Sequence, residues 1–424
     1  MFKYHLLVGH LGRPEEGRPG GAELRLWIYV VRRILLIVPV VIGVMTITFV
    51  LVNALPVQQR LVSYYGPSPR LSYNPIIPCS KLTGDPSTVG NCTNPAYTRG
   101  VAALGLDKPI PVQWAIYIGN SLTGHWGYVG NGTGVTQSVP ITRGQPVVTV
   151  LGWFLPYTLE LAGLSLLLIL IIAIPIGNLS AVNRNRPVDQ AARVLSFSGY
   201  AMPAFLLGSV LLMAFVLLLG GSSGLSPFCH GQSSYTDLTG SWPPPQCFPG
   251  QLYPTWLQSG AISSPTGFPT VDAAYHGLWF MALDTLIRIL IPAFVIAYGT
   301  VALLLRFVRN SMLEVLNLDF VRTARAKGLP EKAVVKKHAG RNSLNVTITV
   351  LGLTFAGFIG GFPIIEQVFQ LNGVGRMIAY SVTLTPYDFG MIFGSTILFT
   401  LLVVSANIIV DVLYAFLDPR VRLG

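Results

Sequence analysis

The chain has 424 residues, of which 51% are hydrophobic and only 11% are charged. Soluble domains carry about a quarter charged residues, so this deficit excludes an ordinary water-soluble fold and indicates that lipid surrounds much of the chain. A net charge of +11 would suggest nucleic-acid binding in a soluble protein. Here the Lys and Arg residues fall in short segments between apolar runs, without a basic and aromatic platform, so we expect no nucleic-acid partner.

Six apolar runs are long enough to cross about 30 Å of hydrocarbon as helices. We therefore predict an all-α integral membrane protein with six transmembrane helices. The fourth run is the weakest, because it contains Arg288, which we expect to snorkel to the outer surface. The first run is too long for the apolar core of a signal peptide, so we expect it to remain as an anchor. The runs cover residues 31–55, 155–181, 195–219, 283–306, 346–366 and 390–416.

The distribution of basic residues predicts the orientation of the spans. If both termini are cytoplasmic, 20 of the 28 Lys and Arg residues lie in cytoplasmic segments. We therefore expect a multi-pass protein of the cell membrane with two large external regions. The predicted order is a cytoplasmic start at 1–30, a span at 31–55, an external region at 56–152, two spans within 153–219, an external loop at 220–282, a span at 283–306, a cytoplasmic loop at 307–345, two spans within 346–416 and a cytoplasmic tail at 417–424.

All four cysteines lie in the two external regions. Cys79 and Cys92 share the first, and Cys229 and Cys247 share the second. This placement favours two local disulfides in an oxidising compartment over four free thiols. The neighbouring His230 has no CxxC partner set, so we expect no metal site.

The external regions also contain two N-x-[ST] triplets, which begin at Asn91 and Asn131. Both are glycosylation candidates, although such triplets also arise by chance. The second external region, 220–282, contains no Lys or Arg. That composition fits an acidic exterior, such as that of a thermoacidophile, and an ordinary Pro-rich loop equally well.

The longest cytoplasmic loop has its own helical pattern. Apolar residues recur near helical spacing over 311–327, and Gly328 is typical of a helix end. Pro330 and Glu331 then open a second helix that we expect to reach Lys337. A folded helix–turn–helix of this kind suits docking into a groove of a soluble partner. The alternative is a basic loop that lies on anionic lipid.

The stretch FVRTARAKGL at 320–329 resembles the "EAA" loop of ABC importer permeases, in the form found in the peptide and nickel permease branch. It departs from the general pattern at the acid, which is replaced by Arg322, and downstream at Asn345-Val346, where the family often has Leu-Pro. The resemblance implies that this loop couples the permease to an ATPase. The implied coupling residues are Arg322, Thr323, Ala324, Lys327, Gly328 and Leu329.

Further segments resemble the same branch in the same order, so the resemblance covers nearly the whole chain. It implies the fold of a type I ABC importer permease. We expect the chain to be an archaeal member of this branch. The segments are VRRILLIVPVVIGVMTITFVLVNALP at 31–56, LGLDKPIPVQW at 104–114, Gly124-His125-Trp126-Gly127, Leu155-Pro156-Tyr157-Thr158-Leu159-Glu160, Glu366 with Val368-Phe369, Gly373-Val374-Gly375-Arg376 and the terminal 411–420.

The resemblance implies a permease that pairs with a second, homologous permease, two cytoplasmic ATPase subunits and an external solute-binding protein. The chain has no G-x-x-x-x-G-K-[ST] phosphate loop, so we expect a non-catalytic subunit without a cofactor of its own, with ATP and Mg²⁺ in the partner ATPases. The implied cargo is a peptide or, in the same architecture, an oligosaccharide or nickel. A secondary carrier is disfavoured because neither repeat symmetry nor an intramembrane ionisable relay is evident.

Glu366 and Arg376 lie near the external end of the fifth predicted span. Charged residues near membrane depth are functional candidates. They fit a paired external gate and a structural pair at the interface equally well.

Overall fold

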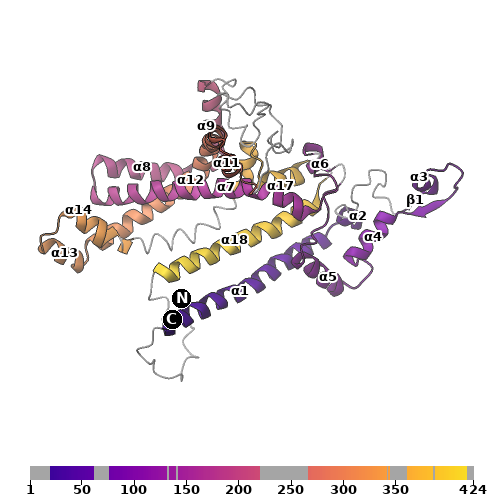
Figure 1. Ribbon diagram of the computed structural model, residues 1–424, viewed down its shortest axis with the longest axis horizontal. Coiled ribbons are helices and arrows are strands. Elements are labelled where there is room, and N and C mark those ends of the chain that lie inside the picture. Colours follow the sequence, from indigo (N-terminus) through magenta and orange to yellow (C-terminus); the bar gives the residue numbers. More distant parts are fainter. Residues whose placement is uncertain are drawn as a thin grey trace.

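The computed structural model describes residues 20–61, 76–130, 133–139, 142–219, 266–340, 342–343, 361–384 and 387–417, and these are predominantly helical. The molecule is elongated, with a bundle of long helices at its centre and smaller elements at both ends (Figure 1).

Three helices carry membrane-spanning stretches that are long and apolar enough to cross a bilayer: α7 (Val147–Val182), α12 (Trp279–Leu316) and α18 (Phe389–Leu417). A bent pair, α8 (Pro187–Ala201) and α9 (Ala204–Leu219), gives a fourth candidate if it counts as one span. The chain is therefore a multi-pass membrane protein. Most of the fifth predicted run, 346–366, lies outside the described residues, so the count of six remains a prediction.

The first predicted span, 31–55, corresponds to the second half of α1 (Gly20–Asn53), which ends two residues earlier than expected. Helix α1 packs against α18, and the two run side by side in opposite directions (Figure 1). The start of α1 and the end of α18 therefore lie at the same end of the molecule, as expected if both termini are on one side of the membrane.

The core of the bundle forms where α7, α8 and α12 pack together. Because lipid is as apolar as the side chains, such packing depends on close contact between helices and on small residues. Gly177 lies against Val308, and Gly199 lies so close to α12 that an added Cβ would be 2.5 Å from the Cβ of Ala302. The buried core residues include Leu161, Ile169, Ala173, Ala192, Ile289, Ala293, Ala297, Val301, Leu304, Leu305 and Val308.

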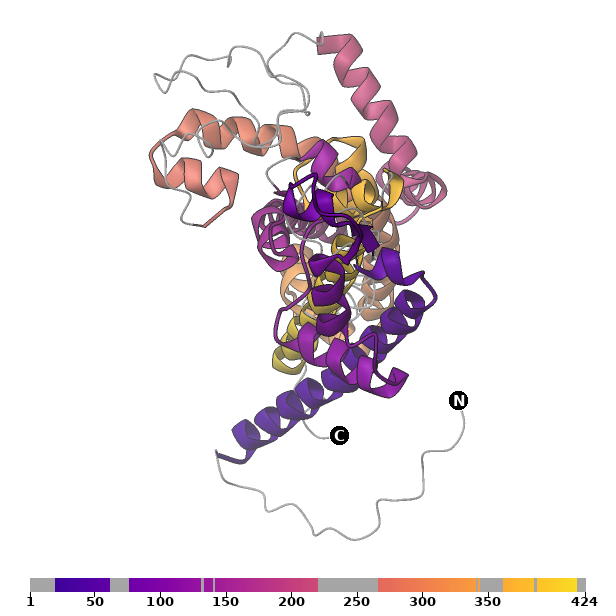
Figure 2. The ribbon, with the colours of Figure 1, turned by 90° about the vertical axis from the view of Figure 1, so that its right-hand side faces the viewer.

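The predicted span 195–219 is not one uninterrupted helix. It begins inside α8, breaks at Met202-Pro203 and continues in α9 at an angle of 106°. The cause is local: a residue before proline is pushed away from helical angles, and Met202 has an extended ψ of 119°. Figure 2 shows α9 standing away from the central stack of helices.

The first region predicted to be external folds into short elements at one end of the molecule (Figure 1). They are α2 (Val57–Leu61), β1 (Ile76–Pro78), α3 (Cys79–Thr83), β2 (Asn91–Thr93), α4 (Pro95–Leu104), α5 (Ile110–Leu122) and α6 (Gly134–Ser138). Strands β1 and β2 are antiparallel, with Ile77 opposite Cys92. The Cys79–Cys92 disulfide closes this hairpin, as predicted. Cys229 and Cys247 lie outside the described residues.

The remaining elements are α11 (Pro269–Tyr275), α13 (Asp319–Ala326), α14 (Glu331–Ala333), the π-helix η4 (Val334–Ala339), α16 (Phe362–Val368) and α17 (Val374–Thr383). Helices α13 and α14 lie at the opposite end of the molecule from the β1–β2 hairpin (Figure 1). The predicted ATPase-coupling residues and the predicted external region are thus separated by the full length of the bundle.

Candidate functional site

The α13–η4 segment, residues 319–339, is a folded unit anchored on the ends of two long helices. On α13, Val321 is fully buried and Ala324 is 6% exposed. They pack in one apolar cluster with the end of α7, the last turns of α12 and η4. The members of this anchoring cluster are Ala181, Met312, Val315, Val321, Ala324, Val334 and Ala339. Helix α13 therefore shares one apolar cluster with the ends of α7 and α12.

The segment differs in detail from the helix predicted over 311–327. Helix α12 ends at Leu316, and α13 begins at Asp319 after Leu318, whose extended backbone breaks the helix. The second predicted helix begins at Glu331, as expected, but its last turns widen into the π-helix η4.

The outward face of the segment carries most of the implied coupling residues. Arg322, Thr323, Lys327 and Leu329 are exposed, and Ala324 points inward, so Ala324 packs α13 onto the bundle and does not contribute to the outer surface. Two large apolar side chains, Phe320 and Leu329, remain 39% and 40% exposed among these cations. A face with both apolar and basic groups is suited to binding a protein groove.

Gly328 forms the turn between α13 and α14. Its φ is +76°, in the left-handed region that costs a non-glycine residue about 1–2 kcal/mol. The turn is closed by the N–H of Gly328, which donates to the Arg325 carbonyl, and by the N–H of Leu329, which donates to the Ala324 carbonyl. A Cβ added at Gly328 would meet no atom within 4 Å. Glycine is therefore required for its backbone conformation and not for lack of space within this chain.

An ion pair spans the turn. The Arg325 guanidinium donates to both Glu331 oxygens, at 3.0 and 2.6 Å. This hydrogen bonding lowers the pKa of Glu331 and raises that of Arg325. Exposed pairs contribute at most about 1 kcal/mol, so this pair mainly orients α14 relative to α13.

A buried carboxylate lies next to the anchoring cluster. Asp189, in the first turn of α8, has no exposed surface. It accepts hydrogen bonds from the Ser180 hydroxyl at 2.6 Å, the Asn185 N–H at 2.8 Å and the Arg193 guanidinium at 2.5 Å. Arg309 of α12 adds two more, at 2.6 and 3.1 Å. The carboxylate thus joins α7, α8 and α12, with two cations around one anion.

At the other end, Glu366 and Arg376 do not form the expected side-chain pair. Glu366 is fully buried and accepts hydrogen bonds from the Thr158 hydroxyl at 2.7 Å and from the Arg376 backbone N–H at 3.1 Å. The Arg376 guanidinium instead donates to the Gln370 carbonyl at 2.5 Å and to the Tyr380 hydroxyl at 2.8 Å. Both charged groups are held within a tightly packed turn, and their role in an external gate stays a prediction.

The two glycines of this turn are required for space. A Cβ on Gly373 would overlap the Glu366 carboxylate, and a Cβ on Gly375 would overlap the backbone of Pro363. The Val374 N–H donates to the Thr158 hydroxyl at 2.9 Å, which ties the turn to α7. The turn therefore wraps around the carboxylate and connects α16, α17 and α7.

A second buried carboxylate at this end caps α18. Asp388 accepts from the Met391 N–H at 3.0 Å, from the Gly130 N–H at 2.9 Å and from the Thr133 hydroxyl at 2.9 Å. Burial raises the pKa of Asp388. Thr133 belongs to the Asn131 triplet and has no exposed surface; Asn131 itself lies outside the described residues.

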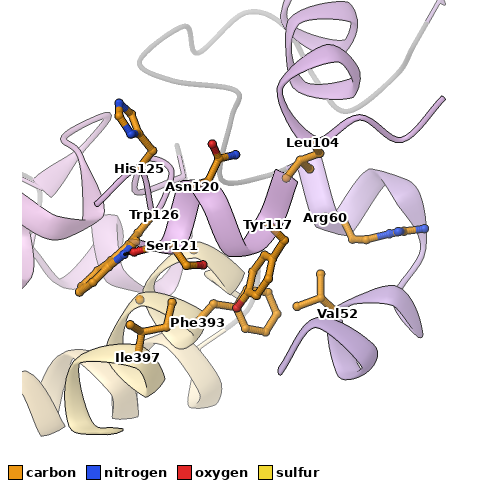
Figure 3. A pocket seen from close by; sticks show the side chains of 12 residues that line it. Val52, Arg60, Leu104, Tyr117, Asn120, Ser121, His125, Trp126, Phe393 and Ile397 are labelled. Atoms are coloured by element: carbon orange, nitrogen blue, oxygen red, sulfur yellow. Dashed lines mark hydrogen bonds between the residues drawn. The ribbon is translucent and has the colours of Figure 1, made fainter. Parts of the chain in front are cut away.

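A cavity of about 60 Å³ lies where α1, α5 and α18 meet at this end. Figure 3 shows the side chains of Tyr117, Trp126 and Ile397 around it, whereas the Arg60 guanidinium points away, donating to Asn53 at 2.6 Å. Ligand pockets usually occupy about 300–1,000 Å³, so this cavity is too small to hold a peptide. We assign no cargo site to it.

Comparison with known proteins identifies the family. The family model described as "Binding-protein-dependent transport system inner membrane component" matches residues 173–423, which include α8, α9, the α13–η4 segment and α18. The chain belongs to this family of ABC importer permeases. It is 30% identical to the oligopeptide transport system permease protein AppB of Bacillus subtilis (strain 168), over 93% of this chain and 99% of that relative.

Two further relatives come from Escherichia coli (strain K12). The permease is 33% identical to the probable D,D-dipeptide transport system permease protein DdpB, over 81% of this chain and 90% of the relative. It is 29% identical to the dipeptide transport system permease protein DppB, over 93% of this chain and 98% of the relative. These relatives are transport permeases, which confirms the predicted family and the membrane location.

Sequence reasoning missed two features of the permease. Arg288 is 1% exposed in α12, so the expectation that it snorkels to the outer surface is wrong. Asp189 was not recognised, although Pro187 followed by an acid marks a helix start. No local signal pointed to Arg309, which lies 120 residues further along the chain.

Proposed function

We propose that this permease forms half of the translocation pathway of an ATP-driven importer and receives the motion of its ATPases through the α13–η4 segment. The observation that carries this proposal is the exposed face of Arg322, Lys327 and Leu329 around a rigid glycine turn, anchored on the ends of α7 and α12. An anchored, rigid surface transfers a partner's movement to the spans, whereas a loose basic loop on lipid would not.

The permease itself supplies no catalysis in this proposal. ATP and Mg²⁺ bind to two separate ATPase subunits, and a second, homologous permease completes the pathway. An external solute-binding protein delivers the cargo. Closure of the ATPases moves the α13–η4 segment, and the connected helices open the pathway to the outside; ATP hydrolysis resets it. This is alternating access driven by rigid-body motion.

We propose peptides of a few residues as the cargo. Support comes from three relatives whose names specify oligopeptides, D,D-dipeptides and dipeptides. The cargo is identified by mass spectrometry of the ligand that the associated binding protein carries. A bound short peptide supports the proposal; a bound oligosaccharide or nickel ion overturns it.

We propose that the α13–η4 segment and both termini are cytoplasmic and that the β1–β2 hairpin is external. This orientation places the disulfide in an oxidising compartment. It also makes Asn91 a candidate for glycosylation in a host that transfers glycans to N-x-[ST] triplets, because Asn91 and Thr93 are both exposed on β2. In the Asn131 triplet the Thr133 hydroxyl is buried and bonded to Asp388, so we propose Asn91 as the preferred site.

The docking proposal is tested with Leu329→Asp, because Leu329 is exposed and its replacement leaves the packed cluster intact. We expect loss of ATPase co-purification and of cargo uptake in proteoliposomes. Val89→Asp is the matched control, since Val89 is 96% exposed in the external hairpin. Normal co-purification and uptake with Leu329→Asp would exclude this surface as the docking site.

A further inference from the structure

The buried Asp189 carboxylate holds three helices together at the point where they meet the α13–η4 segment. It accepts five hydrogen bonds from four residues, which belong to α7, the α7–α8 turn, α8 and α12. Arg309 contacts both oxygens, a bidentate geometry that fixes orientation as well as distance. Arg309 has a side chain only 15% exposed, so water competes little for this contact.

The Asp189 contacts lie directly beside the anchoring cluster. Ser180, which donates to Asp189, immediately precedes Ala181 of that cluster. Arg309 lies three residues before Met312, on the same face of α12 about one helical turn away. The polar contacts of Asp189 thus lie next to the apolar anchoring cluster that holds α13. Figure 1 shows α7, α8 and α12 side by side, with α13 and α14 at their end.

Helix α8 is also held at its far end. The Ser198 hydroxyl and the Tyr298 hydroxyl are 2.7 Å apart, and Gly199 is in close contact with Ala302. Both ends of α8 are therefore fixed to α12. Immediately beyond, the chain breaks at Met202-Pro203 and turns by 106° into α9. The far-end contacts of α8 thus lie directly next to this break.

We propose that Asp189 is a positioning residue for transport: it makes α7, α8 and α12 one rigid body, so that displacement of the α13–η4 segment reaches the α8–α9 break. The inference rests on the proposed coupling function. It goes beyond that function by naming the contact that transmits the motion after the ATPases have docked. Without the contact, the ATPases still dock and hydrolyse ATP, but the start of α8 is no longer tied to α7 and α12, and only its far end remains fixed to α12.

A purely structural role makes a different prediction. Both partners of a buried ion pair can often be replaced together without loss of stability. Removal of only one partner impairs folding, because the other charge stays buried without a partner. If Asp189 had only this structural role, its loss would lower the yield of the complex. The amount of cargo moved per ATP by each assembled complex would stay unchanged. The transport role instead lowers the amount of cargo moved per ATP in complexes that are fully assembled.

The experiment compares Asp189→Asn with the double variant Asp189→Asn/Arg309→Gln in the complete complex of permeases, ATPases and binding protein in proteoliposomes. The double variant removes both the anion and its main cation, so no unpaired charge is buried. Arg184→Gln is the control, because it removes a charge from the same turn at an exposed position. ATP hydrolysis and cargo uptake are measured on the same vesicles.

We expect both Asp189 variants to retain ATPase co-purification while cargo moved per ATP falls about tenfold, within the range of coupling between distant sites. Unchanged cargo per ATP in either assembled variant overturns the proposal. Failure of both variants to assemble assigns Asp189 a folding role only and also overturns it. The wild-type complex tests the proposed function separately: if the wild-type complex shows no ATP-dependent uptake, the proposed function fails.

Discussion

Gly328 offers a test of how the turn of the α13–η4 segment is built. The left-handed φ of +76° disfavours any residue with a Cβ, whereas an added Cβ would meet no atom of this chain within 4 Å. Asn adopts left-handed angles more readily than most other non-glycine residues, and Leu has the same number and branching of side-chain heavy atoms as Asn. The matched pair Gly328→Asn and Gly328→Leu therefore separates backbone strain from steric conflict.

The expected magnitudes follow from the conformational cost. A non-glycine residue pays about 1–2 kcal/mol for this backbone conformation, which reduces the population of the formed turn by about 5–30-fold relative to glycine. We expect Gly328→Leu to lose most of its uptake and ATPase affinity, and Gly328→Asn to retain the larger part. Affinity is measured by titration of the detergent-solubilised permease with the ATPase, and uptake is measured in proteoliposomes.

Equal losses for the Asn and Leu variants would contradict this reasoning. That result would mean that a partner surface packs against Gly328 and excludes every side chain. Gly328→Ala then distinguishes the two causes, because alanine adds only a methyl group but pays the full cost of the left-handed backbone conformation. A mild effect of alanine beside severe effects of both larger residues would assign the requirement to space at the partner interface.

Three further predictions concern other parts of the chain. Gly373→Ala forces a Cβ into the Glu366 carboxylate, so we expect overpacking to cost about 1–3 kcal/mol and to lower the melting temperature of the purified permease. Cys79→Ser opens a loop of sequence separation 13, so we expect a local destabilisation of about 3 kcal/mol and faster protease cleavage of the hairpin, with the bundle intact. Because Arg325 lowers the pKa of Glu331, the ion pair stabilises the turn at neutral pH, and this stabilisation is lost as pH falls through the lowered pKa. We therefore expect Glu331→Gln to weaken ATPase affinity at neutral pH and to remove the loss of affinity at acidic pH.

The local features of the candidate site were predictable because their causes are local. Helical spacing and Gly328 located the turn between α13 and α14, and apolar runs located α7, α12 and α18. The break at Met202-Pro203 was also present in the sequence, since proline disfavours helical angles in the preceding residue. The break was missed because the apolar run continues across it and is long enough to form one span.

The long-range contacts were not predictable, because no periodicity in the chain records them. The Thr158–Glu366 hydrogen bond joins residues 208 positions apart, and the Asp189–Arg309 contact joins residues 120 positions apart. Sequence proximity suggested a pair between Glu366 and Arg376, but the glycine turn between them brings the Arg376 backbone, and not its guanidinium, to the carboxylate. Charge complementarity alone does not decide which polar groups meet where backbone N–H donors compete.

Four carboxylates are fully buried in the described part of the chain, and each accepts backbone N–H donors near the start of a helix: Asp189 at α8, Asp272 at α11, Glu366 at α17 and Asp388 at α18. The first N–H groups of a helix have no partner within it, and the helix dipole favours an anion there. Glu366 and Asp388 accept from N–H groups in the first turns of α17 and α18, whereas Asp189 and Asp272 accept from N–H groups just before α8 and α11. Among these four, Asp189 alone forms ion pairs with residues in the described part of the chain, Arg193 and Arg309, although a carboxylate at a helix start needs no cation. The two guanidiniums exceed what the cap requires, and the one from α12 ties that cap to a second helix. This excess connection distinguishes Asp189 from the other three caps and is the reason to expect its loss to affect transport as well as stability.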